Sequence, residues 1–333
     1  MSLAGRLLPV LLYMSIEIMR DMEGEKPMDH DVSRALIETV VRRTLTEMRA
    51  DPERSIRNLV DMALAVSKGR FQQRFFGIAQ RMLEDESSPY YRLAHDTVSY
   101  VDIDRLLQFG MNLGYNSCTE GAQTIRALKM EKGVGVPWTQ RITLPEPFDD
   151  ERQERLSRLI GKGESLGIYT WMLFSEDRPV DALHLIDDHP DSAFFLFCNS
   201  GGLSRECLER LSELDNVMCV LRFDDEAEAG TAELRKKGIL YSVYLPYSTG
   251  DIDQILSGAW FEEAEALSPV FTCLLAEKGC SEKAIKKAAA FAQTALDEQR
   301  YRTLPVEFLS VIEEVGQIIS GDPEQADLKI IKG

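Results

Sequence analysis

Polar and charged side chains follow the short apolar runs in the second half of this 333-residue sequence. When parallel strands alternate with helices, the residues that come just after each strand meet at one mouth of the sheet. We therefore expect a polar, mixed-charge site at that mouth. The candidate ligand-binding residues are Glu176, Asp177, Arg178, Asn199, Ser200, Gly201, Arg222 and Tyr247.

These side chains suit the recognition of a small zwitterion. Arg178 or Arg222 would pair with a carboxylate, and Glu176 or Asp177 would pair with an amine. The two adjacent acids also suit acid–base chemistry. The alternative is an ordinary barrel rim whose charges pair with one another, and the sequence leaves both interpretations open.

The segment Ser200-Gly201-Gly202 follows a predicted strand and precedes a helix that Ser204 would cap. Backbone N–H groups and the helix dipole can receive an anion at such a place. Glycines also make tight turns between a strand and a helix. Neither Lys-Ser nor Lys-Thr follows, which argues against a nucleotide-binding loop.

The loop after the first apolar run has no residues for covalent or metal chemistry. Thr139–Leu144 passes into the next helix through Pro145–Asp149, which contains no cysteine, histidine, glycine or lysine. The six cysteines form no Cys-x-x-Cys pair, and the four histidines have no metal-binding spacing. His184 and His189 would lie at the opposite end of the barrel from Cys198. We predict no catalytic residue and no metal site.

Two regions of different periodicity must position these residues. Residues 1–135 show an apolar period near that of a helix and predict an all-helical N-terminal domain, with one long helix from Ile103 to Met130. Asp51-Pro52 and Ser88-Pro89 are typical helix starts. Residues 136–320 predict a partial β/α barrel, and residues 321–333 a polar tail that frays.

Six short apolar runs in the second region predict parallel strands joined by helical crossovers. They are Thr139–Leu144, Ile168–Phe174, Ala193–Phe197, Val217–Leu221, Leu240–Leu245 and Pro269–Leu274. Pro305–Ile319 is expected to be helical. The predicted fold class is therefore α/β, with an all-α domain followed by a partial (β/α)6 TIM-like barrel.

Charge and composition exclude several classes of partner. A net charge of -17 argues against nucleic acid, although ten Lys or Arg residues outnumber six Asp or Glu between Asp31 and Arg81. That segment predicts solvated helix faces or a docking face for an acidic partner. Leu7–Met19 is interrupted by Glu17, is too short for a bilayer and is interpreted as a buried helix, so no membrane is expected. Scattered cysteines without a secretory signal favour the cytoplasm.

The order of these features resembles the radical S-adenosylmethionine (radical SAM) superfamily, and more narrowly its bacterial members with a helical domain before the barrel. The matching segments are Asp51-Pro52-Glu53, Tyr90-Tyr91-Arg92-Leu93 and Val136-Pro137-Trp138. Asn199 matches the family's Thr-Asn-Gly at the end of the third strand. The resemblance implies a partial barrel whose mouth holds a four-iron cluster and S-adenosylmethionine.

The sequence departs from the family at the residues that bind these groups. Leu144–Glu151 has neither the length nor the sulfur of the Cys-x-x-x-Cys-x-x-Cys loop. Glu176-Asp177-Arg178-Pro179 stands where the family has Gly-Gly-Glu-Pro, so only the proline is kept. Without cluster ligands no electron reaches the sulfonium. We therefore predict neither cluster nor S-adenosylmethionine, the alternative being a relocated cluster on Cys118, Cys198 and Cys273.

The expected function is that of a catalytically degenerate radical SAM-like protein that acts as a noncatalytic binding or regulatory partner. A related intact radical SAM enzyme is the expected protein partner, by analogy alone. The alternative is a small-molecule-binding enzyme or sensor that uses the rearranged polar mouth without an iron–sulfur cluster.

Overall fold

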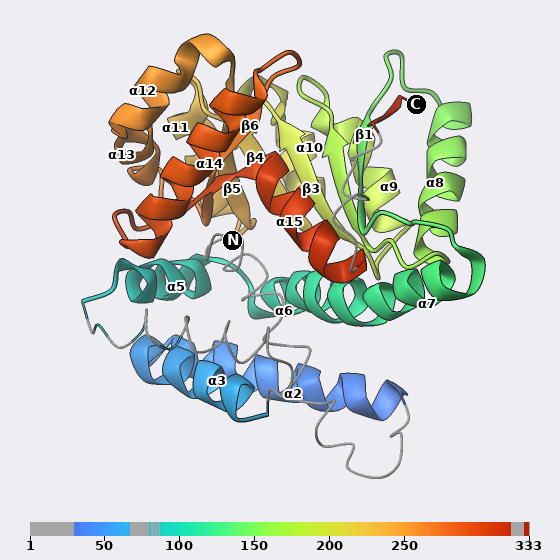
Figure 1. Ribbon diagram of the computed structural model, residues 1–333, viewed down its shortest axis with the longest axis horizontal. Helices are drawn as coiled ribbons and strands as arrows, with labels where there is room; N and C mark the ends of the chain where they lie inside the picture. Colours follow the sequence, from blue (N-terminus) through green and yellow to red (C-terminus); the bar gives the residue numbers. More distant parts are fainter. Residues whose placement is uncertain are drawn as a thin grey trace.

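The computed structural model describes residues 30–66, 80, 83, 85, 87–320 and 330–332. A helical region lies below a parallel sheet that is covered by helices (Figure 1). The helices of this region are α2 (His30–Met48), α3 (Pro52–Val66), α5 (Pro89–Tyr100), α6 (Ile103–Met111), the π-helix η1 (Asn112–Gly121) and α7 (Ala122–Lys132). The α/β class and the order of a helical region followed by a partial barrel are confirmed. The proposed helix at Leu7–Met19 lies outside the described residues.

Both predicted helix starts are present. Pro52 opens α3, and the Asp51 carboxylate accepts the backbone N–H of Arg54 at 3.0 Å. Pro89 opens α5, and the hydroxyl of Ser88 accepts the backbone N–H of Tyr90. The local sequence therefore determines where these helices begin.

The expected long helix from Ile103 is continuous to Lys132, but its middle is the π-helix η1. The wider turn lets Asn112 and Asn116 donate side-chain hydrogen bonds to the loop before the third strand, including one to the Ser192 carbonyl at 2.9 Å. At its end Gly121 touches the backbone of Gly167, where any side chain would clash. The π-helix thus contacts the segments that lead into the second and third strands of the sheet.

In the described part of the chain the sheet has eight parallel strands, in the order β7-β6-β5-β4-β3-β2-β1-β8. All six predicted strands are present: β1 (Thr139–Thr143), β2 (Thr170–Phe174), β3 (Ala193–Cys198), β4 (Val217–Arg222), β5 (Tyr241–Tyr247) and β6 (Phe271–Ala276). Crossover helices cover the outer face (Figure 1). They are α8 (Asp150–Glu164), α9 (Leu183–Asp187), α10 (Arg205–Leu211), α11 (Ala227–Lys236), α12 (Ile252–Ser257), α13 (Ala259–Glu265) and α14 (Glu282–Asp297).

The stretch expected to be one helix from Pro305 begins instead with a seventh strand. Leu304–Glu307 is β7, which pairs with β6, and α15 follows as Phe308–Ser320. Near the C-terminus, Ile330–Lys332 forms β8 on the free side of β1. The two ends of the open sheet are therefore β7 and β8.

Helix α15 packs on the inner face of the half-barrel rather than outside it. Phe308 makes edge-to-face contacts with Phe197 and Phe195 of β3, at ring-centroid distances of 5.2 and 6.1 Å. The indole of Trp138 donates to the carbonyl of Ile312 at 3.0 Å. Figure 1 shows α15 crossing the sheet toward α7. Side chains of α15 thus occupy part of the central space of the half-barrel.

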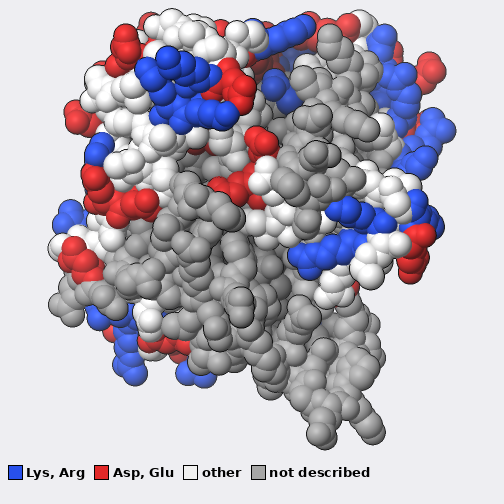
Figure 2. Space-filling model, viewed as in Figure 1, with Lys and Arg blue, Asp and Glu red and all other residues white. Residues whose placement is uncertain are grey.

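No helix among the described residues is both long and apolar enough to cross a membrane. Positive and negative side chains are interspersed on the described part of the face in Figure 2. In the N-terminal helices, Arg34 pairs with Asp191, Arg42 with Asp104, and Arg43 with Glu47. These ion pairs favour solvated helix faces for the described part of the basic segment.

Candidate functional site

A cavity of about 340 Å³ opens at the carboxyl ends of β1 and β2. It is the place where the sequence predicted a polar mouth. Its lining includes the predicted Glu176, Asp177 and Arg178, and also Arg141 of β1 and Glu146 of the loop after β1. Both carboxylates and guanidinium groups therefore face this space.

The loop after β1 is short and built to start a helix. The Leu144 N–H donates to the carbonyl of Phe174 at 2.9 Å, which extends the β1–β2 pairing. Asp149 then caps α8 by accepting the N–H of Arg152 at 3.0 Å. The loop offers the cavity no thiol and no imidazole.

The predicted rim residues are largely engaged with one another. Arg178 donates two hydrogen bonds to Asp181, at 2.8 and 3.1 Å, and this partner raises the pKa of the arginine. Arg178 is therefore not free to hold a ligand carboxylate. At an exposed site such a pair adds little stability.

Two further contacts cross the rim, one between the ends of the neighbouring strands β2 and β3, and one between the ends of β2 and β4, which β3 separates. The Asn199 amide donates to the Asp177 carboxylate at 3.0 Å, and Arg222 lies 3.9 Å from a carboxylate oxygen of Glu176. The structure thus brings together five of the predicted residues, but as a network of mutual pairs. This arrangement favours the interpretation of a rim whose charges neutralise one another.

Ser200 and Gly201 lie in a short 3-10 turn, η3 (Ser200–Gly202), before α10. The adjacent Gly202 is required by packing, because a side chain there would reach within 2.6 Å of Pro179. Ser204 caps α10 as expected. This close packing explains the glycine at position 202 without an anion.

Tyr247 is the last residue of β5, but its side chain does not line the cavity at the mouth. Its side chain is fully buried on the outer face, and its hydroxyl donates to Glu307 of β7 at 3.2 Å. Burial and the nearby carboxylate raise the pKa of Tyr247. Side chains alternate between the two faces of a strand, so Tyr247 lies on the face of β5 opposite to Tyr244. Its hydrogen bond to Glu307 therefore links β5 to β7 on the outer face.

Sequence reasoning missed Arg141, which occupies the inner face of β1. Its guanidinium carbon lies 3.8 Å from the ring centroid of Phe174, and that ring stacks on Phe197 at 4.2 Å. Its Nε is buried with no hydrogen-bond partner, and burial lowers the pKa of the group. The sequence signal for this residue is a charged side chain in the middle of a short predicted strand.

The cysteines, all within the described residues, do not form a relocated metal site. Cys198 contacts Cys219 of the neighbouring strand, with the sulfur atoms 3.3 Å apart. Burial raises the pKa of Cys118 to about 12 and also raises that of Cys273. In the described chain no three His, Cys, Asp or Glu residues are grouped to hold a metal ion. The donor set therefore does not fit an iron–sulfur cluster.

A Ser–His–Glu arrangement lies at the opposite end of the barrel. His189 has one ring nitrogen 3.1 Å from the Ser157 hydroxyl and the other 3.1 Å from the Glu164 carboxylate, which also accepts from Ser192 at 2.6 Å. Ser157 lies inside α8, where the backbone N–H groups are used within the helix, so no oxyanion donors accompany it. The network instead anchors α8 to the loop before β3.

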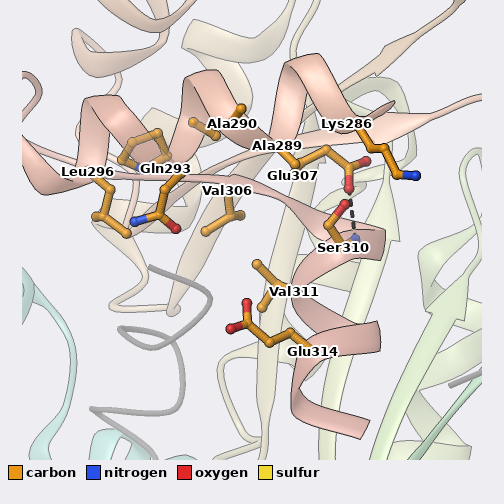
Figure 3. Close-up of a pocket in the computed structure, with 12 residues that line it drawn as sticks. Lys286, Ala289, Ala290, Gln293, Leu296, Val306, Glu307, Ser310, Val311 and Glu314 are labelled. Atoms are coloured by element: carbon orange, nitrogen blue, oxygen red, sulfur yellow. Dashed lines mark hydrogen bonds between the residues drawn. The ribbon is translucent and has the colours of Figure 1, made fainter. Parts of the chain in front are cut away.

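A second cavity, of about 280 Å³, lies between α14, β7 and α15 (Figure 3). Val306 and Val311 are among the apolar side chains that line it, and Figure 3 shows Glu307 directed at the backbone N–H of Ser310, which donates to it at 2.7 Å. Pro305 lacks an N–H on this edge strand, which disfavours the addition of another strand. Glu307 caps α15 here.

Glu307 is expected to make stability depend on pH. It is 2 % exposed, and burial raises its pKa above the usual value. A raised carboxyl pKa means that the folded state holds the proton more tightly, so this contribution is present at low pH and is lost as pH rises through the folded pKa. Its size is about 1.4 kcal/mol per pKa unit.

We therefore expect the Glu307→Gln variant to show a smaller loss of stability than the parent chain between acidic and neutral pH. Urea unfolding at several pH values measures this difference. The exposed Glu233→Gln change on α11 is the control and should leave the pH profile unchanged. Parallel profiles for the parent and Glu307→Gln would contradict the assignment.

Comparisons with known proteins add no family assignment. No family model matches the sequence, and no curated protein matches it. The crystal structure of Streptococcus suis SuiB bound to the precursor peptide SuiA aligns at a TM-score of 0.42 and 10% identity, over 65% of this chain and 57% of that one. A second crystal structure of Streptococcus suis SuiB aligns at 0.36 and 12%, over 83% and 65%. The chain thus spans less than two thirds of SuiB in either structure. The fold assignment rests on the strand topology of this chain itself.

Proposed function

We propose that this chain is a degenerate relative of the radical SAM superfamily that acts as a noncatalytic binding or regulatory protein in the cytoplasm. The proposal rests on the quoted sequence segments together with the half-barrel topology. The expected partner is a related intact radical SAM enzyme. The proposal includes the loss of both the iron–sulfur cluster and S-adenosylmethionine.

The main support comes from two features, the helix that packs on the inner face of the half-barrel and the composition of the loop after β1. Helix α15 packs on the inner face through Phe308, and the loop after β1 has no thiol to hold iron. A four-iron cluster needs cysteine thiolates that converge on one point, and the described cysteines do not do so. No reaction step is therefore assigned to such a group.

Iron loading and partner capture test this proposal. After anaerobic incubation with iron and sulfide, the purified chain should retain no stoichiometric iron, and S-adenosylmethionine should leave its melting temperature unchanged. An affinity-tagged chain expressed in its native host should enrich a protein that carries Cys-x-x-x-Cys-x-x-Cys, whereas the tag alone should not. About four bound irons per chain would contradict the loss of the cluster. A chain that repeatedly purifies alone would contradict the partner role.

A specific observation also favours the alternative of a small-molecule site without a cluster. Arg141 places a guanidinium at a cavity of about 340 Å³, and its buried Nε has no partner. Cavities of this size hold small ligands. A binding protein of this kind can regulate a partner in response to a metabolite, so the two roles are compatible.

A further inference from the structure

We propose that the cavity at the ends of β1 and β2 binds a small α-amino acid with an apolar side chain, whose carboxylate is held by Arg141. The inference rests on the small-molecule candidate described above and names its ligand class. Arg141 replaces Arg178 and Arg222 as the anchor, and the acidic rim supplies the partner for the ammonium group.

Among the described residues Arg141 has no carboxylate at ion-pair distance, and the charge of Glu176 acts on it only from farther away. Its Nε is buried without a hydrogen-bond partner. One face of its guanidinium is covered by the ring of Phe174. A partly buried cation with unused donors is costly unless a ligand completes it, and a carboxylate matches the fork of an arginine.

The other two arginines of the mouth, Arg178 and Arg222, are already paired with carboxylates. Arg178 is bonded twice to Asp181, and Arg222 lies beside Glu176 on the far side of the rim. A carboxylate bound to either would have to displace a residue of the chain. Arg141 demands no such exchange, so it is the favoured anchor.

In the lining of the cavity, carboxylates outnumber arginines by two. Glu146, Glu176, Asp177 and Asp181 face the cavity, against Arg141 and Arg178. An anion alone would be repelled by this excess, whereas a ligand that also carries an ammonium group satisfies it. The exposed Glu146 and the rim carboxylate of Asp177 are the available acceptors.

The cavity also has an apolar part that suits the side chain of the amino acid. Leu144, Pro145 and Phe174 form an apolar part of the lining. The volume lies at the small end of the range for ligand sites, which suits an amino acid better than a nucleotide. L-leucine, with an apolar side chain next to both charged groups, is therefore a fitting probe.

Titration calorimetry with the full chain tests the proposal. We expect L-leucine to bind, and 4-methylpentanoate and 3-methylbutylamine, which each lack one charged group, to bind at least about tenfold more weakly. The Arg141→Gln variant should lose at least about tenfold in leucine affinity, and Arg141→Lys should lose less because it keeps the charge. Arg205→Gln, an exposed ion-pair change on α10, is the matched control and should bind as the parent does.

Two results would overturn the inference. The first is the absence of any heat of leucine binding at concentrations up to roughly 10 mM. The second is an equal affinity for leucine in the parent chain and in a folded Arg141→Gln variant. Circular dichroism and the melting temperature of each variant establish folding, and Arg141→Lys gives the second comparison if Arg141→Gln unfolds. Equal affinities for 4-methylpentanoate and leucine would show that the acidic residues do not bind the ammonium group of the ligand. Iron loading and partner capture do not depend on Arg141, so a failure here is distinguishable from a failure of the noncatalytic role.

Discussion

Replacement of Phe308 by alanine is expected to lower the free energy of unfolding by about 3–5 kcal/mol. Phe308 is 4 % exposed and contacts Phe195 and Phe197 on the inner face of β3. Removing the ring leaves a cavity between α15 and the sheet that rigid strands cannot close. Chemical denaturation monitored by circular dichroism measures the loss.

The control for this change lies on the same helix. Glu313 is exposed on α15, and Glu313→Ala should change stability by no more than about 0.5 kcal/mol. If Phe308→Ala cost no more than the control, α15 would not be packed inside the half-barrel. The inner face of the half-barrel would then not be occupied by α15.

Replacement of Arg105 by methionine is expected to destabilise the chain by about 2–4 kcal/mol. Arg105 on α6 is 7 % exposed, and burial lowers its pKa. Its guanidinium donates to the carbonyls of Leu214 at 2.9 Å, of Ser212 at 2.6 Å and of Gly238. Methionine fills much of the volume but leaves these carbonyl oxygens without their donors.

The measurement also reports on the junction between the two regions. Arg105 belongs to the helical region, and its three acceptors precede β4 and β5. Its loss should therefore weaken the packing of α6 against the loops that lead into these two strands. The exposed Arg92→Met change on α5 is the control, with an expected effect of no more than about 0.5 kcal/mol. A similarly small effect for Arg105→Met would show that water replaces the guanidinium.

Much of the fold could be predicted because strand and helix signals are local. The runs at Ala193 and Val217 are short, apolar and flanked by turns, and each lies in a strand whose apolar residues are all buried. Strand β7 was missed because its four residues contain Pro305 and run directly into the apolar pattern of α15. A proline is tolerated there only because β7 is at the edge of the sheet, which is a tertiary fact.

Less of the candidate site could be predicted. The sequence indicated that Glu176, Asp177 and Arg178 follow β2 and share a mouth with Asn199, and the cavity and its contacts place them there. It gave no means of knowing that Arg178 turns back to Asp181. Such pairing depends on rotamers and loop geometry rather than on residue spacing.

By itself the sequence determined the parallel β/α order, the helix starts and the lack of thiols after β1, because these depend on local pattern and composition. Only the tertiary structure decided that α15 packs on the inner face, that Tyr247 bonds to Glu307 on the outer face, and that the buried Nε of Arg141 has no hydrogen-bond partner at the cavity. The physical reason is that side-chain partners come from segments far apart in the chain, and their meeting is set by the packing of the sheet as a whole.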